Sequence, residues 1–139
     1  MSFIKNYLLK IKNLYVMKNL INWFEIPVSD MDRAVAFYSK LFGEPITVQD
    51  FGGTLMGWLP MESQEGVGGS LVKHEMYIPS HHGSLVYLNG NDDLSVMLGR
   101  VEAAGGKILR GKTQISPDIG YMAIFEDSEG NRIALHSQN

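Results

Sequence analysis

The most constraining feature of this sequence is a pattern that occurs twice: a strand, a helix and three further strands. Asp30 precedes the first apolar helical stretch and Gly43 follows it. Asp93 and Gly106 stand in the same places in the second half, each 63 residues further along (93 − 30 and 106 − 43). An Asp can cap the free N–H groups of a helix start, and a Gly often ends a helix in the left-handed conformation. The shared spacing favours two βαβββ modules of one kind.

The predicted elements follow the same order in both modules, judged from apolar periodicity and turn residues. Those of the first module are 20–28, 31–42, 45–51, 54–60 and 69–78. Those of the second module are 84–90, 94–104, 107–115, 121–127 and 131–137. The sequence therefore predicts an α+β domain over residues 20–137, with modules at about 20–80 and 84–137, after an extension of residues 1–19.

The extension, residues 1–19, differs in composition from the rest. Lysines at positions 5, 10, 12 and 18 interrupt its apolar residues too often for a membrane span. A secretory signal would need an unbroken apolar run, which is missing, so we expect a cytoplasmic protein. A loosely docked extension fits this composition. A short amphipathic helix on a membrane or a partner stays open, as does a natural start at Met17.

The composition excludes several classes of protein and site. The net charge of −3 and the pI of about 5.7 lack the basic excess of a nucleic-acid binder, so we expect no nucleic-acid partner. The absence of cysteine excludes disulfides, thiolate nucleophiles and Cys-based zinc sites. A metal would need oxygen ligands or one of four histidines: His74, His81, His82 and His136.

Strand geometry predicts where a ligand would bind. Side chains alternate between the two faces of a sheet, so each module packs one face on its helix and leaves the other free. Two such sheets that join and curl would form a half-barrel with a concave inner face. That face is the natural place for a small-molecule site.

Three stretches carry a resemblance to a known family: IPVSDMDRAVAFYSKLFG, VYLNGNDDLSVMLGRVEAAGGKIL and GYMAIFEDSEGNRIALHS. Together they resemble the vicinal oxygen chelate superfamily, which includes glyoxalase I, the fosfomycin and bleomycin resistance proteins and the extradiol dioxygenases. The resemblance covers residues 20–137. It implies tandem βαβββ modules that form a curled mixed sheet, with a concave ligand cup inside, helices outside and a homodimeric assembly.

Enzymes of that family hold one divalent metal with His, Gln or Glu side chains from both modules, and the metal acts as a Lewis acid. The resemblance places three ligands at Trp23, Leu85 and Ala134. It places the fourth at Leu71 or Val72, or at His74 if the register slips. Trp, Leu and Ala offer no lone pair to a metal, so we expect no metal and no other cofactor at the usual place. A divalent metal in a relocated site stays open.

Alternation also predicts which side chains share the cup. Trp23, Leu85, Tyr87, Asn89 and Ala134 should bind the ligand by packing or hydrogen bonding. Trp23 could instead fill the core, and Tyr87 could anchor its hydroxyl to a neighbouring strand.

Glu25 and His136 are the candidate catalytic residues on the same face. If Glu25 is buried, its pKa rises and it can act as a base, and with His136 it would form an acid–base couple. The structural alternatives are a Glu25 carboxylate paired with Arg132 or His136, or exposed to solvent, and a His136 side chain frayed at the chain end.

Two other features have simpler interpretations. His81 and His82 are adjacent beside Gly83 and are expected to be solvated loop residues. The glycines at positions 66, 68 and 69 are not followed by the Lys-Ser/Thr of a phosphate-binding loop, and we interpret them as a flexible hinge between strands.

Three functions remain open. The first is a metal-independent binder of a small aromatic or amphipathic molecule. The second is a lyase, isomerase or dioxygenase-like enzyme whose metal site is rebuilt from Glu25 and His136, with His74 or Asn89. The third is a metal-independent enzyme that uses Glu25 as its base.

Overall fold

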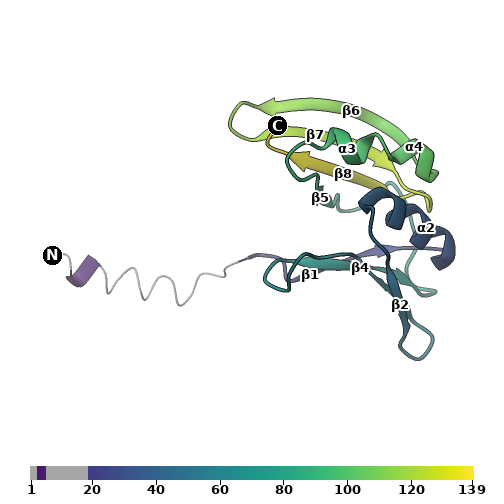
Figure 1. Ribbon diagram of the computed structural model, residues 1–139. Helices are drawn as coiled ribbons and strands as arrows, with labels where there is room; N and C mark the ends of the chain where they lie inside the picture. The colour runs from purple at the N-terminus through teal and green to yellow at the C-terminus, as the bar shows by residue number, and fades with distance from the viewer. Residues whose placement is uncertain (1–2, 6–18) are drawn as a thin grey trace.

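The computed structural model describes residues 3–5 and 19–139, and the predictions for the rest of the extension, residues 1–2 and 6–18, lie outside them. The described chain forms two four-stranded sheets with helices between them (Figure 1). No helix among these residues is long and apolar enough to cross a membrane.

The first sheet contains the strands of the first module. They are β1 (Trp23–Pro27), β2 (Thr47–Asp50), β3 (Leu55–Trp58) and β4 (Gly68–Lys73), in the order β1-β4-β3-β2. β1 pairs in parallel with β4, and the other two pairings are antiparallel. The predicted hairpin of β2 and β3 is confirmed.

The second sheet repeats this arrangement. Its strands are β5 (Tyr87–Asn89), β6 (Lys107–Ser116), β7 (Gly120–Glu126) and β8 (Arg132–Ser137), in the order β5-β8-β7-β6. β5 is parallel to β8, and the other pairings are antiparallel. The same strand order in both sheets confirms the α+β fold class and the tandem βαβββ modules.

The helix of the first module matches its prediction. α2 (Met31–Phe42) begins after Asp30, whose side chain accepts the backbone N–H of Arg33. It ends at Gly43, which has the left-handed φ of 72°. A side chain at this φ would be strained, so the glycine defines the end of the helix.

The single helix expected over residues 94–104 is wrong. The structure has two short helices instead, α3 (Ser95–Leu98) and α4 (Val101–Ala104). Gly99 and Arg100 interrupt them, and the Arg100 N–H bonds the Met97 carbonyl three residues back rather than four. Glycine disfavours helix, and the Arg100 guanidinium is drawn to the Leu41 carbonyl at the end of α2, 3.0 Å away.

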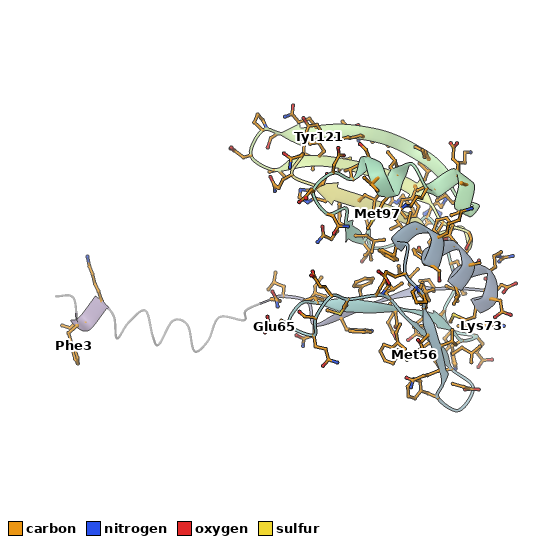
Figure 2. All side chains as sticks on the ribbon, in the orientation of Figure 1. Phe3, Met56, Glu65, Lys73, Met97 and Tyr121 are labelled. Carbon is orange, nitrogen blue, oxygen red and sulfur yellow. The ribbon has the colours of Figure 1, made fainter. Side chains whose placement is uncertain are left out.

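One hydrophobic core joins the modules. α2 lies between the two sheets (Figure 1), and side chains fill the space on both sides of it (Figure 2). Its fully buried Phe37 packs against Phe125 of the second sheet in a tilted ring contact, with ring centroids 5.9 Å apart. Ile26 and Leu71 of the first sheet belong to the same core. The helices therefore cover the inner faces of both sheets.

This arrangement differs in one respect from a single curled sheet with helices outside. The two sheets are hydrogen-bonded separately, and β1 and β5 are both edge strands. Because the helices lie between the sheets, the two faces free of helices are on the outer side of the molecule. The side chains expected to share one cup are consequently divided between these outer faces, which we call the open faces.

The turn 127–131 connects the modules through its buried carboxylate. Asp127 is 3% exposed and accepts a 2.6 Å hydrogen bond from the Tyr38 hydroxyl of α2. It also accepts the backbone N–H groups of Glu129 and Asn131 and the side-chain amide of Asn131. That amide donates in turn to the Pro27 carbonyl, 2.7 Å away, at the end of β1.

Glu129 in the same turn satisfies the start of α2. Its carboxylate accepts the backbone N–H groups of Ser29 and Asp30 and two guanidinium N–H groups of Arg33. Burial of Glu129 raises its pKa, but these hydrogen bonds outweigh burial and leave the pKa below its usual value of 4.5. The Asp-x-Glu-Gly-Asn pattern thus holds the two modules together.

The glycine cluster is not a hinge. Gly68 and Gly69 are the buried first residues of β4. A Cβ at Gly69 would lie 2.5 Å from the Phe24 ring, and one at Gly68 would lie 2.2 Å from the Met61 sulfur. These glycines are needed because aromatic and thioether side chains pack directly on the strand.

Candidate functional site

The open face of the first sheet carries Trp23 and Glu25, as alternation predicts. Their neighbours Ile26 and Val28 are buried in the core, whereas Trp23 is 40% exposed and Glu25 is exposed. In the strand register Ser70 of β4 lies between Glu25 of β1 and Trp58 of β3. Trp58 therefore shares this face, which the sequence analysis did not anticipate.

The two tryptophans form a fixed aromatic pair. Their ring centroids are 5.5 Å apart at 66°, an edge-to-face contact. The Trp23 indole N–H donates to the buried Ser70 hydroxyl at 3.3 Å, and the Trp58 indole N–H donates to Gln49 at 2.8 Å. Phe51 extends the cluster with an edge-to-face contact to Trp58 at 6.4 Å. Trp23 is thus not core filling.

Glu25 pairs with neither Arg132 nor His136. Its Oε1 accepts a 2.8 Å hydrogen bond from the hydroxyl of Tyr77, in the segment that links the modules. This bond to the carboxylate raises the pKa of Tyr77, because it favours the protonated hydroxyl. Glu25 is exposed, so the burial that would make it a strong base is missing.

The open face of the second sheet brings together three of the predicted residues. Tyr87 and Asn89 of β5 lie opposite Ala134 and His136 of β8 in the parallel register. Tyr87, Asn89 and His136 line a cavity of about 530 Å³, and the remaining lining residues are Leu88, Ile115 and Ile119. Three of the seven predicted residues therefore line one shallow, mainly apolar site with a few polar groups.

The polar groups of this cavity already have partners within the chain. His136 Nε2 lies 2.6 Å from the Ile119 carbonyl oxygen. A carbonyl only accepts, so this ring nitrogen carries a proton and is not free to bind a metal. The Asn89 side-chain oxygen accepts the backbone N–H of Asn91 at 2.8 Å. His136 is thus an anchored, half-buried residue and not a frayed one.

Ala134 and Leu85 are partly or fully packed against other parts of the chain. Ala134 is fully buried between Tyr87 on one side and Ile124 on the other. Leu85 is half-buried in the segment just before β5. Neither side chain can donate to a metal or a hydrogen bond.

A small cavity of about 90 Å³ lies where β1 approaches the segment before β5. Glu25 and Arg132 both line it, together with polar residues of the linking segment: Ser80, His82 and Ser84. The Nε of Arg132 is buried and has no hydrogen-bond partner among the described residues. Arg132 is therefore a cationic group that is available to a ligand or to water.

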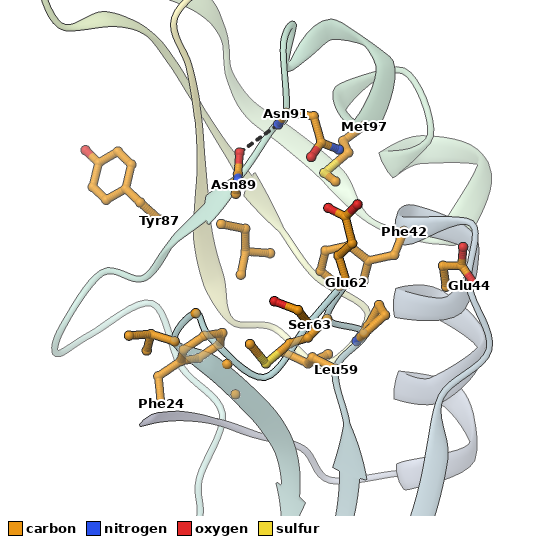
Figure 3. A pocket seen from close by; sticks show the side chains of 17 residues that line it. Phe24, Phe42, Glu44, Leu59, Glu62, Ser63, Tyr87, Asn89, Asn91 and Met97 are labelled. Atoms are coloured by element: carbon orange, nitrogen blue, oxygen red, sulfur yellow. Dashed lines mark hydrogen bonds between the residues drawn. The ribbon is translucent and has the colours of Figure 1, made fainter. Parts of the chain in front are cut away.

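A larger cavity of about 880 Å³ opens between the sheets beside α2 (Figure 3). Phe24 and Leu59 lie on the side of the first sheet, and Tyr87, Asn89 and Met97 on the side of the second. The walls of this cavity include core-facing side chains, so the cavity belongs to the space between the sheets that the helices also occupy. It borders the open face of the second sheet through Tyr87 and Asn89 of the edge strand β5, which line both cavities.

The residues at the positions where the family resemblance places metal ligands do not fit a metal. Trp23, Leu85 and Ala134 supply no donor, and the fourth position on the open face of β4 falls on Val72, since Leu71 belongs to the core. Across residues 3–5 and 19–139, no three His, Asp, Glu or Cys side chains gather in a metal-binding group. Within one chain, Glu25 and His136 lie on different sheets.

The other histidines have local partners. His81 is an exposed loop residue, as expected, and its Nε2 lies 2.6 Å from the Glu126 carboxylate. His82 is exposed, as expected. His74 accepts the Met76 backbone N–H in a turn.

Four residues beside the open faces were missed from the sequence: Trp58, Tyr77, Ile115 and Ile119. The alternation of β3 relative to Gly57, which is buried against Met31, could have placed Trp58 on the open face. Nothing local marks Tyr77 or Ile119, because each belongs to a loop that returns to a strand distant in sequence.

Comparison with known proteins agrees with this geometry. The model of the Glyoxalase/Bleomycin resistance protein/Dioxygenase superfamily matches residues 20–135. A glyoxylase-like domain-containing protein of Didymella fabae is 28% identical over 127 residues, covering 86% of this chain and 94% of that protein. Metallothiol transferase FosB of Shouchella clausii (strain KSM-K16) is 26% identical over 128 residues, covering 87% and 82%.

Two solved structures illustrate the shared fold. The E144Q mutant of glyoxalase I from Zea mays has a TM-score of 0.67 at 18% identity, and the match covers 86% of this chain. This chain spans 45% of that protein's length. TnmS3, an antibiotic binding protein from Streptomyces sp. CB03234, has a TM-score of 0.60 at 22% identity, covering 90% of this chain and all of the other (100%).

Proposed function

This chain belongs to the Glyoxalase/Bleomycin resistance protein/Dioxygenase superfamily, and on that premise we propose that it binds a small molecule without the family's divalent metal. The observation that carries the proposal is the chemistry of the usual ligand positions. Trp23, Leu85 and Ala134 provide apolar surface there and no donor atom. The likeness to an antibiotic binding protein supports a binding role for the fold.

The proposed ligand contacts lie on both open faces. Trp23 and Glu25 belong to the first sheet, and Tyr87, Asn89 and His136 belong to the second. Within one chain these sets are on separate outer faces. A cup that contains both sets requires a second copy, whose second-sheet face covers the first-sheet face of the first copy.

We therefore propose a homodimer with two equivalent cups. Sedimentation equilibrium tests the assembly, with a dimer mass expected. A monomer at micromolar concentration would contradict it. A location in the cytoplasm stays a prediction from the sequence.

Binding can be tested with N-phenyl-1-naphthylamine, an uncharged apolar dye whose fluorescence rises in an apolar site. We expect saturable binding to the purified protein. Ile119→Ser should weaken it, because Ile119 supplies apolar surface to the 530 Å³ cavity. Ile119 is exposed, so this substitution leaves the core intact.

Val67→Ser is the matched control, because Val67 is exposed and, of the cavities described above, lines only the inner one of about 880 Å³. Normal dye binding by this variant is the expected result. Loss of binding in Val67→Ser with full binding in Ile119→Ser would move the site to the space between the sheets. No saturable binding in the wild type would refute the binding function.

A metal-dependent enzyme is the second candidate, favoured by the 26% identity to a metallothiol transferase. Its donors would be Glu25 of one copy and His136 of another, brought together in the dimer. His136 would first have to release the Ile119 carbonyl. A binding protein needs no such rearrangement, because it uses these side chains in their present positions. Binding is therefore the better-supported proposal.

A further inference from the structure

We infer that the open face of the first sheet recognises an organic ammonium group, held between the carboxylate of Glu25 and the rings of Trp23 and Trp58. The inference rests on the proposed binding function and adds the chemical class of the ligand. Three observations support the inference: the exposed aromatic rings, the single charged side chain on this face, and the hydrogen bonds that fix the rings.

The rings present the surface that an organic cation prefers. An indole has a negative face, and a cation within about 6 Å of its centroid is attracted to it. Trp23 and Trp58 meet edge to face, which leaves ring faces that are not stacked on each other. The 40% exposure of Trp23 shows that part of its surface is open. Phe51 is also exposed and adds a third ring beside Trp58.

The charge on this face has one sign. By strand register its other members are Gly68, Ser70, Val72, Met56, Trp58, Thr47 and Gln49. Glu25 is thus the one charged side chain that the four strands place here. Among the described residues it makes no ion pair, and its Oε2 has no hydrogen-bond partner. An anionic ligand would be repelled by this carboxylate.

Glu129 is a carboxylate with a structural role, and its surroundings differ from those of Glu25. Its side chain is 0% exposed and pairs with Arg33. Glu25 instead keeps one oxygen free, while Tyr77 fixes the other with a hydroxyl that adds no charge. The Tyr77 bond orients the carboxylate without an ion pair, and Arg132, the cationic side chain that borders the same small cavity, makes none with it among the described residues.

The site is rigid before any ligand binds. Ser70 and Gln49 hold the two indole N–H groups, and Ser70 is fully buried beneath them. Side chains that are already ordered lose little entropy on binding, which favours affinity. The chain has two tryptophans, and both belong to this site, so tryptophan fluorescence reports on it alone.

The test uses three probes of matched shape and different charge: choline, 3,3-dimethylbutan-1-ol and 3,3-dimethylbutanoate. Tryptophan fluorescence of the full chain is titrated with each at constant ionic strength. We expect choline to bind about tenfold more tightly than the neutral alcohol, through the cation–π and carboxylate contacts. The carboxylate probe should bind most weakly.

Glu25→Gln should abolish the preference for choline and leave the affinity for the alcohol unchanged. Glu62→Gln, which removes an exposed carboxylate of the inner cavity, should keep the preference. Choline binding no tighter than that of the alcohol, or an undiminished preference in Glu25→Gln, would overturn the inference. If these results occur while N-phenyl-1-naphthylamine still binds, the proposed binding function survives and only the ligand class fails. A fluorescence response to none of the probes also overturns the inference.

Discussion

The turn 127–131 and the open faces of the sheets use similar residue types in opposite ways. In the turn, Asp127 and Glu129 accept hydrogen bonds from the surrounding chain on nearly every side. On the open faces, Glu25 keeps a free oxygen and the buried Nε of Arg132 has no partner among the residues described. Satisfied polar groups hold a fold together, and unsatisfied ones are available to a ligand.

The Asp-x-Glu-Gly-Asn turn fastens the second sheet to α2 and β1. On the open faces, Glu25 is exposed and makes one hydrogen bond. Variants of the turn should therefore change stability, and variants of the open faces should change binding.

The largest effect is expected from Asp127→Ala. The substitution leaves the Tyr38 hydroxyl and two backbone N–H groups without their acceptor in a buried site, at a cost of about 3–4 kcal/mol. Urea unfolding measures the loss. Asp118→Ala, at an exposed turn position, is the control and should change stability little. Equal effects of the two substitutions would contradict the structural role of the turn.

Tyr38→Phe should have a smaller effect. It removes the buried hydroxyl but keeps the ring, so Asp127 loses one of its donors, at a cost of about 1–2 kcal/mol. Burial, followed by the neighbouring Asp127 carboxylate, raises the pKa of Tyr38 well above its usual value. The phenol therefore stays protonated, and the effect of the substitution should not vary between pH 6 and pH 9. A variation over that range would show that the hydroxyl ionises.

Glu129→Gln should cost about 1 kcal/mol at neutral pH, since it removes the ion pair with the half-exposed Arg33. The folded pKa of Glu129 lies below 4.5, so its contribution is present above that pH. The contribution is lost as pH falls through the folded pKa. The difference between wild type and variant should therefore shrink below pH 4. A constant difference across this range would refute the ionic contribution.

Glu25→Gln should have the smallest effect on stability, within about 0.5 kcal/mol, because Glu25 is exposed and makes one hydrogen bond. Thermal unfolding monitored by circular dichroism is a sufficient measurement. A loss as large as that of Glu129→Gln would assign Glu25 to the framework of the fold. It would then cease to be a candidate ligand contact.

Much of the fold could be predicted from the sequence because the relevant signals are local. Asp30, Gly43 and the alternation around Ile26 depend on neighbouring residues, and the structure agrees with each of them. The break between α3 and α4 was missed because the Leu41 carbonyl that draws Arg100 is distant in sequence.

The candidate site was only half predictable for the same reason. Strand alternation placed Trp23 and Tyr87 on the correct faces. Whether those faces meet depends on how the helices pack, which strand periodicity does not encode. The partner of Glu25 was also missed, since Tyr77 reaches it across the segment that links the modules.

Metal content is the most direct test of the central claim that the usual coordinating positions can no longer hold a cation. The wild-type protein and Glu25→Gln would be dialysed separately against Ni²⁺, Mn²⁺ and Zn²⁺, then against metal-free buffer, and analysed by inductively coupled plasma mass spectrometry. We expect each protein to retain far less than one ion per chain. One tightly held divalent ion per chain in the wild type, lost in Glu25→Gln, would contradict the claim and establish a relocated metal site.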